Sequence, residues 1–212
     1  MKRVFDLLVI VLLAPVWLPV AAIVAVLVWA NLGRPILFAQ DRAGRMGKPF
    51  TLYKFRTMRT GDGPDAERLT RFGRFLRATS LDELPELWNV VRGEMSLVGP
   101  RPLPVRYLPR YTPEENRRHE VLPGITGWAQ VHGRNALDWE TKFRYDVDYV
   151  DNRSLRLDFR ILWMTFAQVI VAKGISHAGE ATMGELSGRR HTTQKIACDA
   201  NDRLSTLLKE EP

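Results

Sequence analysis

Near its N-terminus the chain carries 23 consecutive residues without a charged side chain, from Leu7 to Trp29. As a helix rising about 1.5 Å per residue, such a run is just long enough to cross the ~30 Å hydrocarbon core of a bilayer. It is too long for a cleavable signal peptide, and it lacks an obvious small-residue cleavage site. The sequence therefore predicts a membrane-embedded helix at the start of the chain.

Two features of this run argue against a simple transmembrane span. Pro15 lies near its middle and would leave the Val11 carbonyl without its helical donor, which bends a helix, and Pro19 follows one turn later. Lys and Arg residues flank both ends, and the positive-inside rule places such residues on the cytoplasmic side. A helix that enters the membrane, bends at Pro15 and returns satisfies both observations, so we favour it over a span.

The net charge of +7 is concentrated beside this helix. Residues 1–60 carry nine Lys or Arg side chains against two Asp, which accounts for the whole excess. A basic zone next to an apolar helix indicates contact with anionic lipid head groups rather than with nucleic acid. The single Cys198 excludes a disulfide framework and a cysteine-based zinc site.

The stretch from Thr79 to Pro102 carries the strongest chemical signal. Ser80 followed by Glu83 has the spacing of a capping box, which predicts a helix that starts here, with Asp82 as an alternative N-cap. The apolar positions predict the buried face of this helix; they are Leu81, Leu84, Trp88 and Val91. Under either start, Asp82 and Glu83 lie at a helix N-terminus, where the dipole favours a carboxylate.

Gly93 is expected to end this helix, and the Pro-Arg-Pro run that follows holds Arg101 between two residues of fixed φ. A rigid guanidinium close to helix-start carboxylates suits an anion whose phosphorus a carboxylate can attack. Other elements follow from periodicity and turn residues. We expect strands at 36–40 and 50–58, with Lys54 and Arg56 on one face, and helices at 65–77, 114–120, 139–149 and 156–171. The last helix is either core or interfacial.

Five motifs together resemble the signature of the bacterial sugar transferases, the monotopic phosphoglycosyl transferases that load a sugar phosphate onto a polyprenyl phosphate. They are TSLDELPELWNV at 79–90, MSLVGPRP at 95–102, KFRTM at 54–58, PGITGWAQ at 123–130 and GRN at 133–135. The resemblance covers residues 2–188. It implies an α/β fold, a mostly helical compact domain with a short β-hairpin, attached by an N-terminal re-entrant membrane helix. The implied division is a membrane helix at 1–33, a cytoplasmic catalytic domain at 34–188 and a tail at 189–212.

The implied reaction is transfer of a sugar 1-phosphate from a UDP-sugar to polyprenyl (undecaprenyl) phosphate through a covalent Asp-phosphosugar, releasing UMP and initiating glycoconjugate assembly. By resemblance, Asp82 matches the family's nucleophile and Glu83 its dyad partner. The positions that match its phosphate site are Lys54, Arg77, Arg101 and Arg134. Mg²⁺ is the expected cofactor, with Asp82 as its ligand. The expected location is the bacterial inner membrane, with the catalytic domain facing the cytoplasm.

Two other interpretations remain open at this point. Asp146-Val147-Asp148 resembles the D-x-D metal–nucleotide motif of another glycosyltransferase class, although residues i and i+2 on a helix point about 200° apart. Such an enzyme would release a nucleoside diphosphate. A non-catalytic membrane-bound lipid-binding protein would explain the basic zone and the apolar run, but would leave the Asp-Glu and Pro-Arg-Pro motifs without a role.

Overall fold

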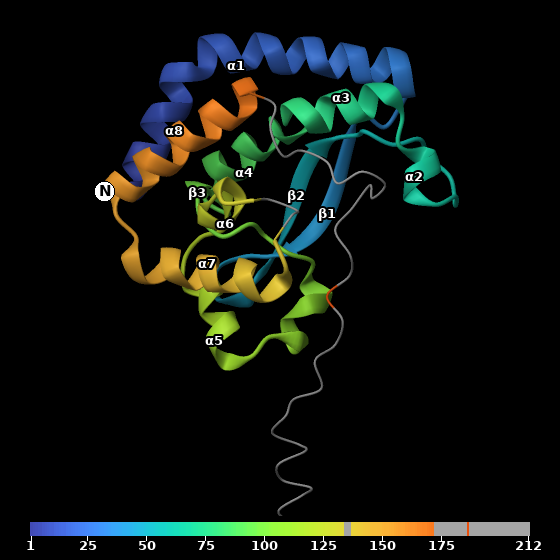
Figure 1. Ribbon diagram of the computed structural model, residues 1–212. Coiled ribbons are helices and arrows are strands. Elements are labelled where there is room, and N and C mark those ends of the chain that lie inside the picture. The colour runs from blue at the N-terminus through green and yellow to red at the C-terminus, as the bar shows by residue number, and fades with distance from the viewer. Residues whose placement is uncertain (134–136, 172–185, 187–212) are drawn as a thin grey trace, which may run out of the picture.

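The computed structural model describes residues 1–133, 137–171 and 186, so the predicted tail and Arg134 lie outside the described residues. Figure 1 shows the long helix α1 (Lys2–Leu32) across one end of the molecule, with α8 (Leu155–Val171) and α3 (Arg71–Thr79) beside it. The β-hairpin lies beneath them, and α7 (Trp139–Asn152) and α5 (Pro113–Asn116) are near the opposite end. The predicted mostly helical fold with a small sheet and an apolar N-terminal helix is confirmed.

Helix α1 continues through Pro15 and Pro19, and Figure 1 shows it changing direction in its N-terminal half. The Trp17 indole N–H donates to the Ile10 carbonyl at 3.0 Å, next to the carbonyl that Pro15 leaves without a donor. Among the described residues, α1 is the one helix long and apolar enough to cross a membrane, with a mean hydropathy of 2.8 over its best 18-residue window. The rest of the protein buries 11% of that window, so most of its apolar surface needs another apolar environment.

Helix α8 is both core and surface. Ile161 is fully buried in the main hydrophobic core, whereas Phe159, Trp163 and Phe166 are exposed on the other side of the helix. The Phe159 ring lies 5.0 Å from the ring of Phe5 in α1, so the exposed apolar surface of α8 adjoins that of α1. The core location is therefore confirmed for one face of α8, and an interfacial location of the other face stays a prediction.

The predicted hairpin is formed by β1 (Leu37–Ala43) and β2 (Pro49–Phe55), which pair antiparallel with Phe38 opposite Lys54. A 3₁₀ turn (Arg45–Gly47) joins them. Strand β2 ends at Phe55, before the predicted Met58. Arg56 turns instead to the end of α1, where it donates to the Leu32 and Gly33 carbonyls. Lys54 and Arg56 therefore do not act on one common group.

The single helix expected at 65–77 is wrong. It is divided into α2 (Asp65–Arg68) and α3, and Thr70 caps α3 by accepting from the Gly73 N–H at 2.9 Å. The sequence signal for this break was the N-cap preference of threonine. Inside α3, Gly73 permits a close approach of two backbones, because a Cβ built there would lie 1.8 Å from the Thr57 carbonyl oxygen.

The start expected for the next helix is also wrong. Ser80 adopts a left-handed conformation (φ 57°) that ends α3, and its side chain caps nothing. Asp82 and Glu83 lie in a 3₁₀ turn, Leu81–Glu83, and α4 runs only from Glu86 to Arg92. Its buried face carries Glu86, Asn89 and Val90, whereas Trp88 and Val91 are exposed. Gly93 ends α4 in the left-handed region, as predicted.

A second, parallel sheet was not predicted. Strand β3 (Ser96–Val98) pairs with β4 (Gly124–Thr126), each only three residues long and without a usable periodicity. The Gly124 N–H also donates to the Pro100 carbonyl at 3.0 Å, which fixes the start of the Pro-Arg-Pro run. The remaining elements are short: 3₁₀ turns at Val105–Arg110 (η3) and Arg117–Glu120 (η4), and α6 at Trp128–Val131.

The close approach at Gly73 predicts an unusual response to alanine. In a helix interior Gly→Ala normally stabilises by about 1 kcal/mol, but here the methyl group must displace the Thr57 backbone, an overpacking cost of roughly 1–3 kcal/mol. We expect Gly73→Ala to lower the thermal unfolding midpoint of the detergent-solubilised protein. Gly63→Ala, where a Cβ meets nothing closer than 3.7 Å, is the matched control and should leave the midpoint unchanged. A Gly73→Ala protein as stable as the parent would contradict the close approach.

Candidate active site

Asp82 and Glu83 lie on one 3₁₀ turn between α3 and α4, and the two carboxylates have different surroundings. Glu83 Oε1 accepts from Lys54 Nζ and from an Arg101 guanidinium nitrogen, each at 2.7 Å. Burial opposes its ionisation, but the charges of Arg101 and Lys54 outweigh this and hold the pKa of Glu83 well below its usual range. Glu83 is therefore a fixed anion.

Asp82 makes no hydrogen bond or ion pair with any described residue, although its side chain is largely buried, with 7% of the residue exposed. Burial, together with the negative charge of Glu83, raises the pKa of Asp82 to about 6, against the opposing charges of Lys54, Arg101 and Arg77. Such a carboxylate is ionised at neutral pH and is more basic than an ordinary Asp. It has the properties of a carboxylate available to bond an incoming group.

Glu86, which the sequence analysis did not single out, is the third acid of this cluster. Its carboxylate is 2% exposed and lies 2.9 Å from Lys54 Nζ, so Lys54 bridges Glu83 and Glu86. Burial raises the pKa of Glu86 to about 7, with the Lys54 charge opposing and the Glu83 charge adding to the effect. Burial is the largest single influence on Lys54 and disfavours its charged form, but the combined charges of Glu83, Glu86 and Asp82 outweigh it and raise the pKa of Lys54. The signal that could have found Glu86 is its i+3 spacing from Glu83.

Arg101 reaches the cluster from the Pro-Arg-Pro run that follows β3. Its side chain is 42% exposed even while it binds Glu83, so part of the guanidinium can meet a ligand. The charge of Glu83 is the main cause of a raised pKa at Arg101, so this group stays charged. The predicted association of a rigid arginine with the Asp-Glu pair is thus present in the geometry.

Arg77 lies in the last turn of α3, and its Nε donates to the Thr57 hydroxyl at 3.1 Å. Burial lowers the pKa of Arg77, whereas the charge of Asp82 acts in the opposite direction. The structure therefore brings together Lys54, Arg77, Asp82, Glu83 and Arg101 of the predicted site. Thr57, which positions Arg77, was not identified from the sequence.

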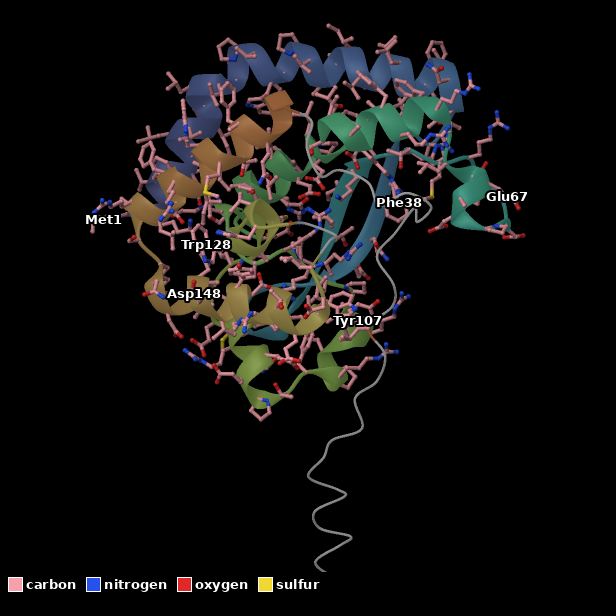
Figure 2. The ribbon with its side chains drawn as sticks, viewed as in Figure 1. Met1, Phe38, Glu67, Tyr107, Trp128 and Asp148 are labelled. Atoms are coloured by element: carbon pink, nitrogen blue, oxygen red, sulfur yellow. The ribbon has the colours of Figure 1, made fainter. Side chains whose placement is uncertain are left out.

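Asp146 and Asp148 of the D-x-D motif do not form a site together. Asp146 is buried and accepts two bonds from Arg118, while Asp148, on the surface of α7, accepts from the Trp128 indole at 2.8 Å. Figure 2 shows Trp128 and Asp148 on the same side of the molecule. Within the described residues, no group of three or more His, Cys, Asp or Glu side chains is arranged to hold a metal ion.

Comparison with known proteins identifies the family. The family model described as bacterial sugar transferase matches residues 1–172. An uncharacterized sugar transferase of Bacillus subtilis, EpsL, is 50% identical, over 89% of this chain and 96% of that protein. The UDP-glucose:undecaprenyl-phosphate glucose-1-phosphate transferases of Caulobacter vibrioides and Xanthomonas campestris are each 40% identical, over 80% and 79% of this chain.

The UDP-galactose-lipid carrier transferase of Erwinia amylovora is 41% identical, over 82% of this chain. The chain spans 69% of the Caulobacter protein but only 41% and 38% of the Erwinia and Xanthomonas ones. The matched region includes the Asp-Glu turn, the Pro-Arg-Pro run and α1, so family and geometry refer to the same part of the molecule. The protein is therefore a transferase enzyme that belongs to the bacterial sugar transferase family.

Proposed function

We propose that this enzyme transfers a sugar 1-phosphate from a UDP-sugar to undecaprenyl phosphate through a covalent intermediate on Asp82. The observation that carries the proposal is the contrast within the Asp-Glu pair. Glu83 is held by two cations, whereas the Asp82 carboxylate has no partner among the described residues. The names of the Caulobacter and Xanthomonas relatives, which specify UDP-glucose and undecaprenyl phosphate, support the substrate classes.

In the first step, an Asp82 carboxylate oxygen attacks the phosphorus that carries the sugar. The bond from this phosphorus to the bridging oxygen breaks, and UMP leaves with that oxygen. In the second step, a phosphate oxygen of the lipid attacks the same phosphorus, and the Asp82 carboxylate departs. One phosphoanhydride is broken and another formed, so the exchange needs no further energy source, and the acyl phosphate retains the activation between the steps.

The surrounding cations suit this chemistry. Charge develops on the oxygens of the transferring phosphoryl group, and preformed positive groups stabilise it. Arg101, Arg77 and Lys54 are held in place by Glu83, Thr57 and Glu86 before any substrate arrives. Mg²⁺ is usually bound by one or two carboxylates together with substrate phosphates. Asp82 is the residue that would hold it here, and the ion would supply further neutralisation of phosphate charge.

We further propose that α1 is re-entrant, so that both of its ends face the cytoplasm. At the N-terminal end, Lys2 pairs with Asp158 at 2.6 Å, and Arg3 donates to the carbonyls of Val90 and Val91 in α4. At the C-terminal end, Arg56 binds the last carbonyls of α1. Both ends are thus tied to the same domain, whereas a span would separate them by ~30 Å of hydrocarbon. The positive-inside rule then indicates the cytoplasmic face of the inner membrane.

The covalent step can be tested by Asp82→Asn. This change keeps the shape and removes the nucleophile, so release of UMP should fall on the order of 10³-fold or more while the protein stays folded. Incubation of the parent enzyme with labelled UDP-sugar and no lipid should place the label on Asp82. Asp148→Asn is the matched control and should retain activity. Release of UDP by the parent enzyme, together with loss of activity in Asp148→Asn, would instead support the D-x-D interpretation.

The role of Arg101 can be tested by replacing its guanidinium group, which can bind two partners at once, with the ammonium group of lysine. If two guanidinium nitrogens contact phosphate and Glu83, Arg101→Lys should lower kcat/KM nearly as much as Arg101→Ala, by roughly 10²-fold, because an ammonium group cannot bind both in this geometry. Arg92→Lys, at a partly exposed pair with Glu94, should have no effect. Near-normal kinetics of Arg101→Lys would reduce Arg101 to a general positive charge.

The topology of α1 can be tested by thiol labelling in a Cys198→Ser background. We expect Lys2→Cys and the domain reporter Glu67→Cys to be shielded from impermeant reagents in intact cells and reactive after the cytoplasm is opened. Replacing Pro15 and Pro19 with Leu should straighten α1 and bring residue 2 to the outside in part of the population. Labelling of residue 2 in intact cells with both prolines present would show a true span.

A further inference from the structure

A buried ion pair between Arg118 and Asp146 contacts the main chain of the Pro-Arg-Pro run. Arg118, in the 3₁₀ turn η4, and Asp146, in α7, have side chains that are each 2% exposed. One carboxylate oxygen, Asp146 Oδ2, accepts from Arg118 Nε at 3.0 Å and from a terminal guanidinium nitrogen at 2.7 Å. Two charges are rarely buried so completely unless geometry and further hydrogen bonds compensate their lost hydration.

Arg118 makes a third bond, and this bond leads to the active site. The terminal guanidinium nitrogen that binds Asp146 also donates to the main-chain carbonyl of Arg101 at 2.8 Å. Aromatic rings restrain the guanidinium, with Tyr111 and Phe143 centred 5.9 and 5.5 Å away. Arg118 therefore presents one rigid donor to one carbonyl of the Pro-Arg-Pro run.

Each carbonyl of this run has its own donor. Pro100 accepts from the Gly124 N–H at 3.0 Å, and Pro102 accepts from Arg42 at 3.3 Å. The middle carbonyl, that of Arg101, accepts from Arg118. Neither flanking proline has an N–H with which to anchor the run through the main chain. The orientation of the Arg101 peptide, and with it the origin of the Arg101 side chain, thus depends on Arg118.

We propose that Arg118, fixed by Asp146, is a positioning residue that aims the Arg101 guanidinium at Glu83 and at the transferring phosphoryl group. This inference rests on the proposed function, because it assigns Arg101 a phosphate-binding role. The path runs from Asp146 through Arg118 and the Arg101 carbonyl to the 2.7 Å contact between Arg101 and Glu83. A displacement of about 1 Å at a catalytic group costs as much as 10²-fold in rate. Arg118 needs no contact with substrate to have such an effect.

The chain offers a matched control at the same interface. Arg117 and Asp151 pair across η4 and α7, as Arg118 and Asp146 do, but their pair is on the surface and does not touch Arg101. If the buried pair served only to dock η4 onto α7, loss of the surface pair, which joins the same two elements, should lower the activity as well. Arg117→Lys should leave the kinetics unchanged.

The test is a double-mutant cycle on the full-length enzyme in detergent or nanodiscs, with release of UMP as the readout. Arg118→Lys retains the charge but cannot hold Asp146 and the Arg101 carbonyl in the same fork. We expect it to lower kcat/KM roughly 10- to 100-fold, in line with a misplaced catalytic group. In an Arg101→Ala background the same change should have almost no further effect, because the residue through which it acts is gone. Asp146→Asn, which keeps the shape of the carboxylate, should behave in the same way.

The outcomes separate the two proposals. Equal losses from Arg118→Lys in both backgrounds would overturn the positioning role and leave a structural one. An Arg101→Ala enzyme with unchanged activity would overturn the phosphate-binding role of Arg101 itself. If Arg118→Lys does not fold, the cycle is read from Asp146→Asn, with the thermal unfolding midpoint confirming that each variant is folded. Non-additivity with either variant supports the proposal.

Discussion

One carboxylate oxygen, Glu83 Oε1, accepts the ammonium group of Lys54 and the guanidinium of Arg101 at the same distance of 2.7 Å. Largely buried charges are tolerated only when they are paired. The end of β2, the 3₁₀ turn and the Pro-Arg-Pro run must therefore come together for the charge on each of them to find its partner. Glu86 strengthens this requirement because it shares Lys54. The cluster thereby fixes the turn on which Asp82 lies, while its cations are engaged by the neighbouring glutamates.

Local sequence patterns predicted the elements that are long or bounded by strong signals. Helices α1, α7 and α8 and the hairpin all lie close to their expected positions. The start of the Asp-Glu segment was wrong because Ser80, which has the spacing of a capping residue, instead adopts a left-handed conformation and ends the preceding helix. The three-and-four spacing of apolar residues assigned Trp88 and Val91 to the core, where the fold places Glu86, Asn89 and Val90.

Tertiary contacts explain what the sequence could not provide. The helix-start acids and the Pro-Arg-Pro run pointed to Asp82, Glu83 and Arg101, whereas Lys54 and Arg77 were assigned to the site only through a resemblance. The geometry brings all five into one cluster. Glu86 was detectable from its separation of one helical turn from Glu83. Arg118 was not, because its partners, the Arg101 carbonyl and Asp146, are 17 and 28 residues away and no local pattern connects them. The short sheet of β3 and β4 was invisible for the same reason.

The residues of α1 also have a second role. Ile10 belongs to the same hydrophobic cluster as Val90 and Val98, and Val24 and Val28 pack with Leu76 of α3. The helix is thus part of the domain's own interior as well as its expected attachment to the membrane, although it precedes the rest of the domain in the sequence. A truncated protein beginning at residue 34 would expose these clusters to water and release the C-terminal carbonyls of α4 from Arg3. Removing α1 would therefore take away part of the domain's own interior, together with the helix whose remaining apolar surface needs another apolar environment.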